Sequence, residues 1–438
     1  MAELIEALEA EAELPSPPPA ILSPRRAIAA ATVGNMLEFY DFVTYAFFAI
    51  QIGNTFFPTG NAYTSLMASL AAFGAGFITR PLGAYVLGGY ADRAGRKPAM
   101  LLSMTLMGVG IALLALTPSY AQIGMIAPII AICARLLQGF ALGGEIGSAT
   151  VYMLEAAQVH RRGFMISWQS ASQGIAATIG AGVGFLLTLV LTDAELASYG
   201  WRIALLIGAS IVPFALLIRR GLPETIHGDE PVAFTSERVR DYWRIIVLGL
   251  VIIGSGTIGA YIFNYMATYG QANLSLSVGT SLAAEAANNL AGAITAMIGG
   301  WLSDRHGRRL LMFWPQFLFM FLVIPCFQWI TTVRDATSFI LANIVLAAVT
   351  GFIWGPVYAA LSESLPKPIR ARVFALVYSI PVALLGGTTQ MVVTWLLHVT
   401  GSNMAIAYYL TVVTALGVLA IWLLPESAPA KLRNPAPS

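Results

Sequence analysis

The sequence is poor in charged residues and in cysteine. Asp, Glu, Lys and Arg make up 11% of its 438 residues, whereas a soluble domain carries about 25%. So few charges neither cover a water-exposed surface nor form the basic face that binding to nucleic acid requires. The only two cysteines, Cys133 and Cys326, both lie in apolar runs. We therefore expect no disulfide framework, no metal site, no cofactor and no nucleic-acid partner.

Apolar residues dominate the composition instead. Hydrophobic residues account for 57% of the chain, and the mean hydropathy is +0.74. A helix needs about 20 apolar residues to cross the hydrocarbon core of a bilayer. Twelve such stretches predict an all-α integral membrane protein with twelve transmembrane helices. The predicted spans are 27–52, 64–91, 99–117, 123–154, 164–191, 201–219, 244–270, 279–302, 310–331, 337–362, 372–400 and 404–424.

The basic residues predict the orientation in the membrane. Cytoplasmic loops carry an excess of Lys and Arg. With the N-terminus inside, the only basic residues on the outer side are Arg202 and Arg334. We expect both termini in the cytoplasm and the protein in the cell inner (plasma) membrane.

Two similar halves are indicated by a repeated motif. Gly88–Lys97 reads G-x-x-x-D-R-x-G-R-K, and Gly300–Arg309 reads G-x-x-x-D-R-x-G-R-R. In transporters, such a repeat places the substrate between the halves near the bilayer midplane. The predicted segments are a disordered cytoplasmic tail over 1–24, a six-helix bundle over 25–219, a cytoplasmic linker over 220–243, a second six-helix bundle over 244–427 and a cytoplasmic tail over 428–438.

These motifs resemble the signature of the major facilitator superfamily. Within it, Gly34–Phe42, Arg80–Gly83 and Arg135–Phe140 resemble the metabolite:proton symporter family, and Ser167–Gln173 is similar to its citrate–proton symporter branch. The resemblance implies the major facilitator fold and ionic latches at the cytoplasmic helix ends that stabilise the outward-open state. The expected gating residues are Asp92, Arg93, Arg96, Arg162, Asp304, Arg305, Arg308 and Arg370.

A few ionisable residues fall within the predicted spans. A charged side chain inside the membrane costs free energy, so such residues are expected to face a charged partner, water or substrate. Arg80 and Arg135 indicate an anionic substrate, because a guanidinium stays charged when buried and matches a carboxylate bidentately. The alternative, compatible with this one, is that each arginine pairs with a nearby carboxylate. Protonation of that carboxylate would then release the arginine for the substrate. The expected proton-coupling residues are Glu38, Asp41 and Glu145, with a packing role as the alternative for Glu145.

Polar residues on the faces of several spans complete the expected binding site. For the amides and hydroxyl of span five, interhelical hydrogen bonding is the alternative. Glu285, in span eight, is expected to have a structural or vestibule role, and Tyr265 and Gln390 are further candidates for the wall of the second half. The expected substrate-binding residues are Arg80, Arg135, Asn35, Gln138, Tyr45, Gln169, Ser172, Gln173, Asn264 and Tyr378.

The expected function is therefore import of citrate or a related di- or tricarboxylate by proton symport. The partners would be a small organic anion, protons and membrane lipid, with sodium as an alternative to the proton. The sequence also allows a symporter for a zwitterionic osmolyte such as betaine or proline, a drug–proton antiporter, and a channel or receptor. We expect a monomer that is not an enzyme and has no catalytic residues.

Overall fold

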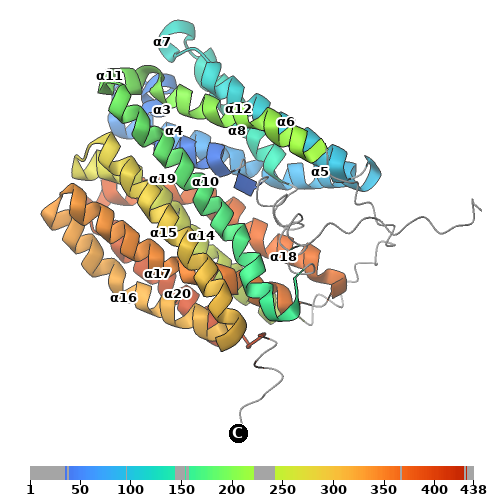
Figure 1. Ribbon diagram of the computed structural model, residues 1–438. Helices are drawn as coiled ribbons and strands as arrows, with labels where there is room; N and C mark the ends of the chain where they lie inside the picture. Colours follow the sequence, from blue (N-terminus) through green and yellow to red (C-terminus); the bar gives the residue numbers. More distant parts are fainter. Residues whose placement is uncertain are drawn as a thin grey trace, which may run out of the picture.

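The computed structural model describes residues 35–36, 39–94, 96–143, 153, 157–220, 242–365, 367–428 and 431. Every regular element among them is a helix (Figure 1). Those before the 221–241 gap are α3 (Ala49–Phe56), α4 (Ala62–Ile78), α5 (Arg80–Ala94), α6 (Arg96–Leu116), α7 (Tyr120–Ile123), α8 (Ile126–Leu142), η1 (Val159–Arg161), α10 (Arg162–Val190), α11 (Asp193–Glu195), η2 (Leu196–Gly200) and α12 (Trp201–Arg220). Those after it are α14 (Trp243–Leu274), α15 (Val278–His306), α16 (Arg308–Val333), α17 (Ala336–Glu363), α18 (Lys367–Pro381), η3 (Val382–Gly386), α19 (Gly387–Thr400) and α20 (Ala405–Leu423).

Seven helical stretches in the described part of the chain are long and apolar enough to cross a membrane. They are Ala62–Leu87, Arg162–Val190, Trp243–Leu274, Arg308–Val333, Ala336–Glu363, Val373–Thr400 and Ala405–Leu423. Two shorter apolar helices are Leu101–Leu116 and Ile126–Leu142. Their lengths follow from long runs of Leu, Ile, Val and Ala, and prolines inside α16 and α17 are accommodated without ending the helix.

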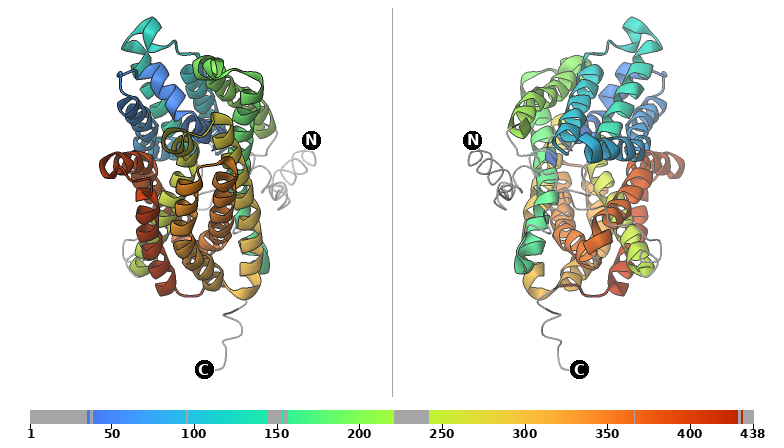
Figure 2. Two further views of the ribbon diagram at one scale, coloured as in Figure 1. Left: turned by 90° about the vertical axis from the view of Figure 1, so that its left-hand side faces the viewer. Right: turned by 90° about the vertical axis from the view of Figure 1, so that its right-hand side faces the viewer.

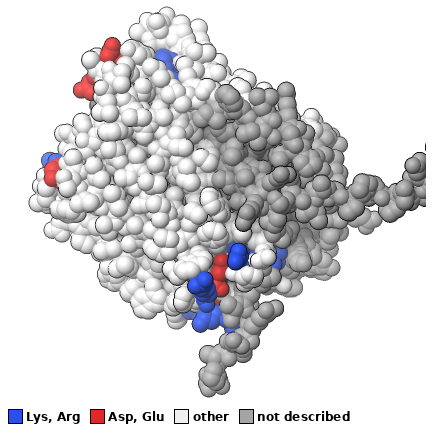
Figure 3. Space-filling model, viewed as in Figure 1, with Lys and Arg blue, Asp and Glu red and all other residues white. Residues whose placement is uncertain are grey.

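The surface of these helices is apolar where lipid would surround it. Trp314, Leu318 and Phe321 lie at four- and three-residue spacing on α16, and each exposes half or more of its surface. On the face shown in Figure 3, the described charged side chains gather near the ends of the molecule and leave the middle without charge. This pattern matches a helix bundle that is solvated by lipid in the middle and by water at its ends.

Glycines let the helices pack closely. A side chain on Gly139 of α8 would collide with the Gly76 carbonyl of α4. Similarly, a side chain on Gly300 of α15 would collide with the Gly163 carbonyl of α10. Because lipid gives no hydrophobic drive for helices to associate, such close backbone contact is a main source of packing energy.

The helices before and after the 221–241 gap form two groups that meet along α10 and α15 (Figure 2). We call these groups the first and second half. One end of their interface, the Asp304 end, holds the junction of α15 and α16. The other, the Gln51 end, holds the contacts between Gln51 and Gln271 and between Tyr63 and His398.

Two elements differ from the predicted spans. Within the span expected over 64–91, α4 and α5 meet at Thr79, where the Gly83 N–H still bonds to the Thr79 carbonyl and the Thr79 hydroxyl donates to the Leu136 carbonyl of α8 at 2.7 Å. The span expected over 372–400 contains a widened π-helical turn, η3, between α18 and α19. The predicted N-terminal tail, nearly all of the predicted linker and most of the predicted C-terminal tail lie outside the described residues.

Candidate functional site

A buried ion pair lies in the first half. Asp41 comes from the helical segment before α3, and Arg135 comes from α8. Arg135 Nη1 lies 3.7 Å from Asp41 Oδ2, and both side chains are almost completely buried. Arg135 Nη1 also donates a hydrogen bond of 2.6 Å to the Gln138 amide oxygen. Neither Asp41 oxygen nor Arg135 Nε has a hydrogen-bond partner among the described residues. The ion pair is therefore loose, and both groups keep unused hydrogen-bonding capacity.

Aromatic rings cover the faces of two guanidinium groups. The Arg135 guanidinium carbon lies 4.6 Å from the ring centroid of Tyr45 and 5.2 Å from that of Phe73. The Arg80 guanidinium carbon lies 4.1 Å from the ring centroid of Phe77 and 5.2 Å from that of Phe42. Such cation–π contacts stabilise a desolvated cation by up to about 2 kcal/mol. They leave the edges of each guanidinium for hydrogen bonds, and the buried Arg80 Nε also lacks a partner among the described residues.

Tyr261 of α14 joins this group of rings from the second half. Its ring packs edge-on against Phe42 and Phe77, at centroid distances of 5.7 and 5.6 Å. The aromatic cluster, Phe42, Phe73, Phe77 and Tyr261, therefore crosses the interface between the halves. It places Arg80 and Arg135 beside the interface between the halves.

Three of the predicted polar residues bind one another. The Asn35 amide donates hydrogen bonds to the Gln169 carbonyl at 3.0 Å and to the Ser172 hydroxyl at 2.7 Å. The Gln169 amide donates back to Asn35 Oδ1 at 3.2 Å. These hydrogen bonds connect the helical segment at Asn35 to α10. They correspond to interhelical hydrogen bonding, the alternative to substrate binding for these residues. Gln173 is half-buried, and its Nε2 has no partner among the described residues.

The residues expected to line the binding site from the second half come from α14, α18 and α19. The Thr394 hydroxyl donates to the Tyr265 hydroxyl at 2.9 Å, and the Gln390 amide donates to the Tyr261 carbonyl at 3.5 Å. Tyr378 is buried, and its ring centroid lies 6.0 Å from that of Tyr358. Asn264 is half-buried on α14.

At the Asp304 end, a carboxylate of one half binds the start of a helix in the other. Asp304 accepts the backbone N–H groups of Gly163 and Phe164, at 2.8 and 3.0 Å, at the N-terminus of α10. The resemblance implied ionic latches at this end of the helices. The ion pair that Asp304 forms is with Arg308, at 2.7 Å, so the cross-half contact uses the unpaired N–H groups of a helix N-terminus.

The other predicted gating residues have different roles or are not described. Arg308 is fully buried and also pairs with Glu363 at 3.1 Å, although it was expected in a cytoplasmic loop. Arg305 is exposed and lies over the Trp301 ring. Arg370 is buried, and its Nε donates to the Leu365 carbonyl at 3.1 Å. Arg162 is half-buried. Outside the described part of the chain lie residues Glu38 and Glu145 and the side chains of Asp92, Arg93 and Arg96.

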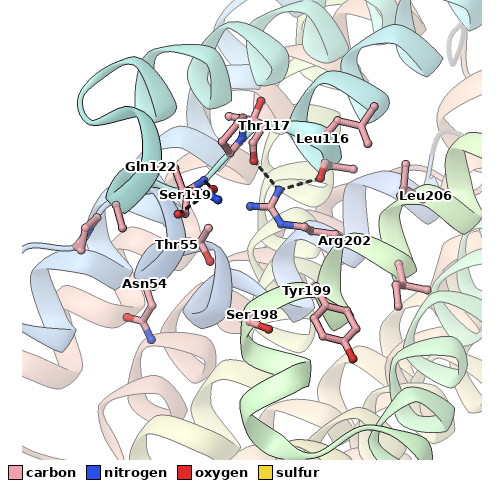
Figure 4. Close-up of a pocket in the computed structure, with 15 residues that line it drawn as sticks. Asn54, Thr55, Leu116, Thr117, Ser119, Gln122, Ser198, Tyr199, Arg202 and Leu206 are labelled. Atoms are coloured by element: carbon pink, nitrogen blue, oxygen red, sulfur yellow. Dashed lines mark hydrogen bonds between the residues drawn. The ribbon is translucent and has the colours of Figure 1, made fainter.

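A pocket of about 850 Å³ lies away from this site, at the Gln51 end of the first half (Figure 4). Arg202 reaches into it and donates hydrogen bonds to the Ala115 and Thr117 carbonyls at 2.8 and 2.6 Å. These bonds cap the C-terminal end of α6, so Arg202 has a structural task there. The pocket contains none of the predicted binding residues.

The aromatic cluster escaped the sequence analysis, although part of its signal was visible. Phe73, Phe77 and Arg80 follow one another at four- and three-residue spacing, which places them on one helix face. Phe42 directly follows Asp41. No sequence pattern linked these residues to Tyr261, because that contact depends on how the halves pack.

Comparison with known proteins agrees with this fold. The model of the family "Sugar (and other) transporter" matches residues 27–227, and that of the Major Facilitator Superfamily matches residues 283–437. A citrate-proton symporter of Klebsiella pneumoniae is 36% identical over 409 residues, which is 90% of each chain. A proline/betaine transporter of Escherichia coli (strain K12) is 30% identical, over 94% of this chain and 86% of the relative.

Solved structures show the same arrangement of helices. A crystal structure of a D-xylose-proton symporter superposes with a TM-score of 0.74 at 17% identity and covers 92% of this chain and 98% of its own. A partially occluded, inward-open form of the xylose transporter XylE from E. coli superposes with a TM-score of 0.73 at 18% identity, over 92% of this chain and 98% of its own. With the apolar helices described above, these relationships make the chain a membrane protein that belongs to the major facilitator superfamily.

Proposed function

We propose that the protein imports citrate or a related di- or tricarboxylate by proton symport, through alternating access. The observation that carries the proposal is the loose, buried Asp41–Arg135 pair, whose free hydrogen-bonding groups lie beside Arg80 and next to the interface of the halves. The relatives named as citrate-proton symporters support the substrate class. Sodium is the alternative coupling ion, because a buried carboxylate can bind either ion.

Competition for Arg135 would couple the proton to the substrate. With the site empty, ionised Asp41 balances the charge of Arg135. A proton on Asp41 removes that balance and leaves a buried cation unpaired, which is costly. A substrate carboxylate then supplies the missing negative charge and accepts from the free guanidinium N–H groups. Proton and anion therefore bind cooperatively, and each favours the other.

The second half would recognise the shape of the substrate through uncharged polar groups. Tyr265, Tyr378, Gln390 and Asn264 offer hydroxyl and amide groups, whereas both site arginines come from the first half. Gln138 and Tyr45 would hold Arg135 in place. Gln173 would contact the substrate from α10, where Asn35, Gln169 and Ser172 bind one another.

The finer architecture belongs to the same proposal. We place twelve transmembrane spans in two six-helix bundles, over 25–219 and 244–427. The protein would lie in the inner membrane of the cell, with the linker 220–243 and both termini in the cytoplasm. The Asp304 end is then cytoplasmic, and the Gln51 end faces outward. The protein would act as a monomer, with Glu38 and Glu145 as further candidates for proton transfer.

Uptake into proteoliposomes tests the function directly. A proton gradient and a sodium gradient are imposed separately, and accumulation of radiolabelled citrate is measured. We expect accumulation with the proton gradient, about tenfold for each coupled proton and pH unit. Accumulation with neither gradient, or only of neutral or cationic solutes, would refute the proposal.

Replacement of the coupling acid separates coupling from binding. Asp41→Asn removes the titrating group but keeps its shape, so gradient-driven accumulation should be lost while exchange of labelled for unlabelled citrate continues. Asp193→Asn, on an exposed carboxyl of α11, is the matched control and should behave like the parent protein. Loss of exchange as well would assign Asp41 a structural role.

A zwitterionic osmolyte is the second candidate substrate. Relatives named as proline/betaine transporters are 30% identical to this chain, and aromatic rings such as those of the cluster also bind quaternary ammonium groups. Here, however, the rings are already occupied by Arg80 and Arg135. Competition of unlabelled betaine with labelled citrate distinguishes the two candidates, and strong inhibition by betaine would favour the second.

A further inference from the structure

A second buried carboxyl lies apart from the site, on α15. Glu285 is completely buried. Its Oε1 accepts the backbone N–H of Ala267 on α14 at 3.0 Å. Its Oε2 accepts the side-chain amides of Asn288 and Asn289 at 3.3 and 3.2 Å. Each of these donors is neutral, and none of the ion pairs among the described residues includes Glu285.

No charged group from the neighbouring helices compensates Glu285 within the described part of the chain. Near the Gln51 end, the charged residues between α16 and α17 are Arg334 and Asp335, and both are exposed. On α14, the Tyr265 hydroxyl binds Thr394 and the Tyr269 hydroxyl donates to the Asn403 carbonyl. The remaining charged side chains of α10, α14, α15, α16 and α17 lie at the Asp304 end, namely Arg162, Arg244, Asp304, Arg305, His306, Arg308, Arg309 and Glu363. Tyr261 of α14, Cys326 of α16 and Tyr358 of α17 are the other titratable groups on these helices.

A buried carboxylate without a cation is strongly disfavoured, and a proton is the simplest way to neutralise it. Glu285 adjoins the contact between the halves. Beside it on α15, the Ala286 carbonyl accepts the Thr178 hydroxyl of α10 at 3.4 Å. The Asn289 carbonyl lies so close to α10 that a side chain on Gly174 would contact it at 2.9 Å. Separation of the halves here would expose Ala286 and Asn289, and the Asn289 amide is one of the donors to the carboxyl.

A chain of hydrogen bonds links the same carboxyl to the Gln51 end. The Ala267 carbonyl, on the residue that donates to Glu285, accepts the Gln271 side-chain amide at 3.0 Å. Gln271 Oε1 in turn accepts the Gln51 amide from the first half at 3.2 Å. Glu285 therefore holds the segment of α14 that carries the cross-half contact.

We propose that Glu285 is a second proton-binding residue and a positioning residue for the Gln51–Gln271 contact, so that closure of the Gln51 end is linked to uptake of one proton. The proton is taken from water as the carboxyl becomes buried and returns to water when this end opens. The inference rests on the proposed function only in that the two ends open alternately. It requires neither a particular substrate nor proton transfer by Asp41.

Distances between spin labels test this linkage without substrate. Thr64→Cys and Thr400→Cys place labels on exposed positions of α4 and α19 at the Gln51 end, in a protein whose Cys133 and Cys326 are replaced. We expect the ratio of closed to open molecules to rise about tenfold per unit fall in pH where one proton is linked to closure. In Glu285→Gln the ratio should stay high and independent of pH. Asp193→Asn is the control carboxyl and should keep the pH dependence.

Two results would overturn the proposal. One is a Glu285→Gln protein with the pH dependence of its parent, and the other is a parent whose closed fraction ignores pH. Asp41→Asn should retain the dependence, which separates this linkage from the coupling acid of the transport site. If Glu285→Gln does not fold, infrared spectra of Asp41→Asn provide a second test. A protonated-carboxyl band should grow with the closed fraction, and a constant band would refute the linkage.

Discussion

At the scale of single residues, the aromatic rings orient the Arg80 guanidinium group. Its guanidinium lies over Phe77 and Phe42, so the plane of the group and the direction of its N–H bonds are fixed. Lysine keeps the charge but has neither the planar face nor the fork. Arg80→Lys should therefore raise the KM for citrate about tenfold, as expected for loss of about 1.4 kcal/mol. Initial rates of uptake measure the change.

Arg202→Lys is the matched control for this substitution. Arg202 is also stacked on aromatic rings, 4.4 Å from the Trp201 centroid, but it lies outside the proposed site. Its replacement should lower thermal stability and leave the KM for citrate unchanged. Equal KM values for Arg80→Lys and the parent would remove Arg80 from substrate recognition.

The sequence predicted the ionisable residues of the site better than their surroundings. Asp41 and Arg135 stood out because charge inside a membrane is costly, and the structure places them together. The Asn35–Gln169–Ser172 contacts could not be distinguished from substrate ligands, because amides and hydroxyls serve both purposes. The contact of Tyr261 with the rings of the first half depends on how α14 is oriented about its own axis. The spacing of residues in the sequence does not determine that orientation.

At the scale of helices, the contact between Asp304 and the N-terminus of α10 should influence which end is open. The carboxylate accepts two N–H groups across the halves and faces the positive end of a helix dipole. Asp304→Asn removes the charge. The closed state of the Asp304 end should therefore become about 2 kcal/mol less stable relative to the open state. Its population ratio to the open state would then fall about 30-fold. Labelling of single cysteines near Gly163 reports the change.

Asp335→Asn provides the comparison within one half. Asp335 also accepts a helix N-terminal N–H, from Ser338 at 2.8 Å, but it caps its own helix, α17. Its replacement should cost about 1 kcal/mol of stability without changing the labelling pattern. A similar labelling change in both variants would contradict a gating role for Asp304.

The sequence located most helices to within a few residues and missed their interruptions. Hydrophobic length predicts that a helix crosses the bilayer, but it does not predict where a helix contacts its neighbour, as Thr79 contacts Leu136 of α8. Asp304 forms an ion pair with Arg308 of its own half, while its contact with the other half is to backbone N–H groups. Opposite charges were visible in the sequence, whereas the free N–H groups at the start of α10 belong to the backbone and leave no trace in it.

At the scale of the whole molecule, contacts across the Gln51 end hold the halves together. The rings of Tyr63 and His398 stack across the interface with centroids 3.9 Å apart. Cysteines at these two positions, in a protein without other cysteines, should be joined by a short thiol cross-linker. Because alternating access needs this end to open, the cross-link should abolish citrate uptake, and a reducible linker should restore it on reduction. Uptake is measured before and after treatment.

Each single-cysteine variant controls for the substitution itself. Reagent should leave uptake by either one unchanged, because no second thiol is available across the interface. Undiminished transport by the cross-linked double variant would show that this end need not open. The repeated motifs of the sequence predicted two similar halves, but no motif indicated the stacked rings, since each ring comes from a different half.

The widened turn η3 also bears on how the halves could move. Gly386, its last residue, and Gly387 leave room for the rings of Tyr261 and Phe77, so the aromatic cluster is docked against this turn. A π-helical turn inside an α-helix is rare and is frequently found at a functional site. The aromatic cluster therefore packs against a segment of the span over 372–400 that departs from regular α-helix. A change in the packing of these rings would thus act directly on the backbone that joins α18 to α19.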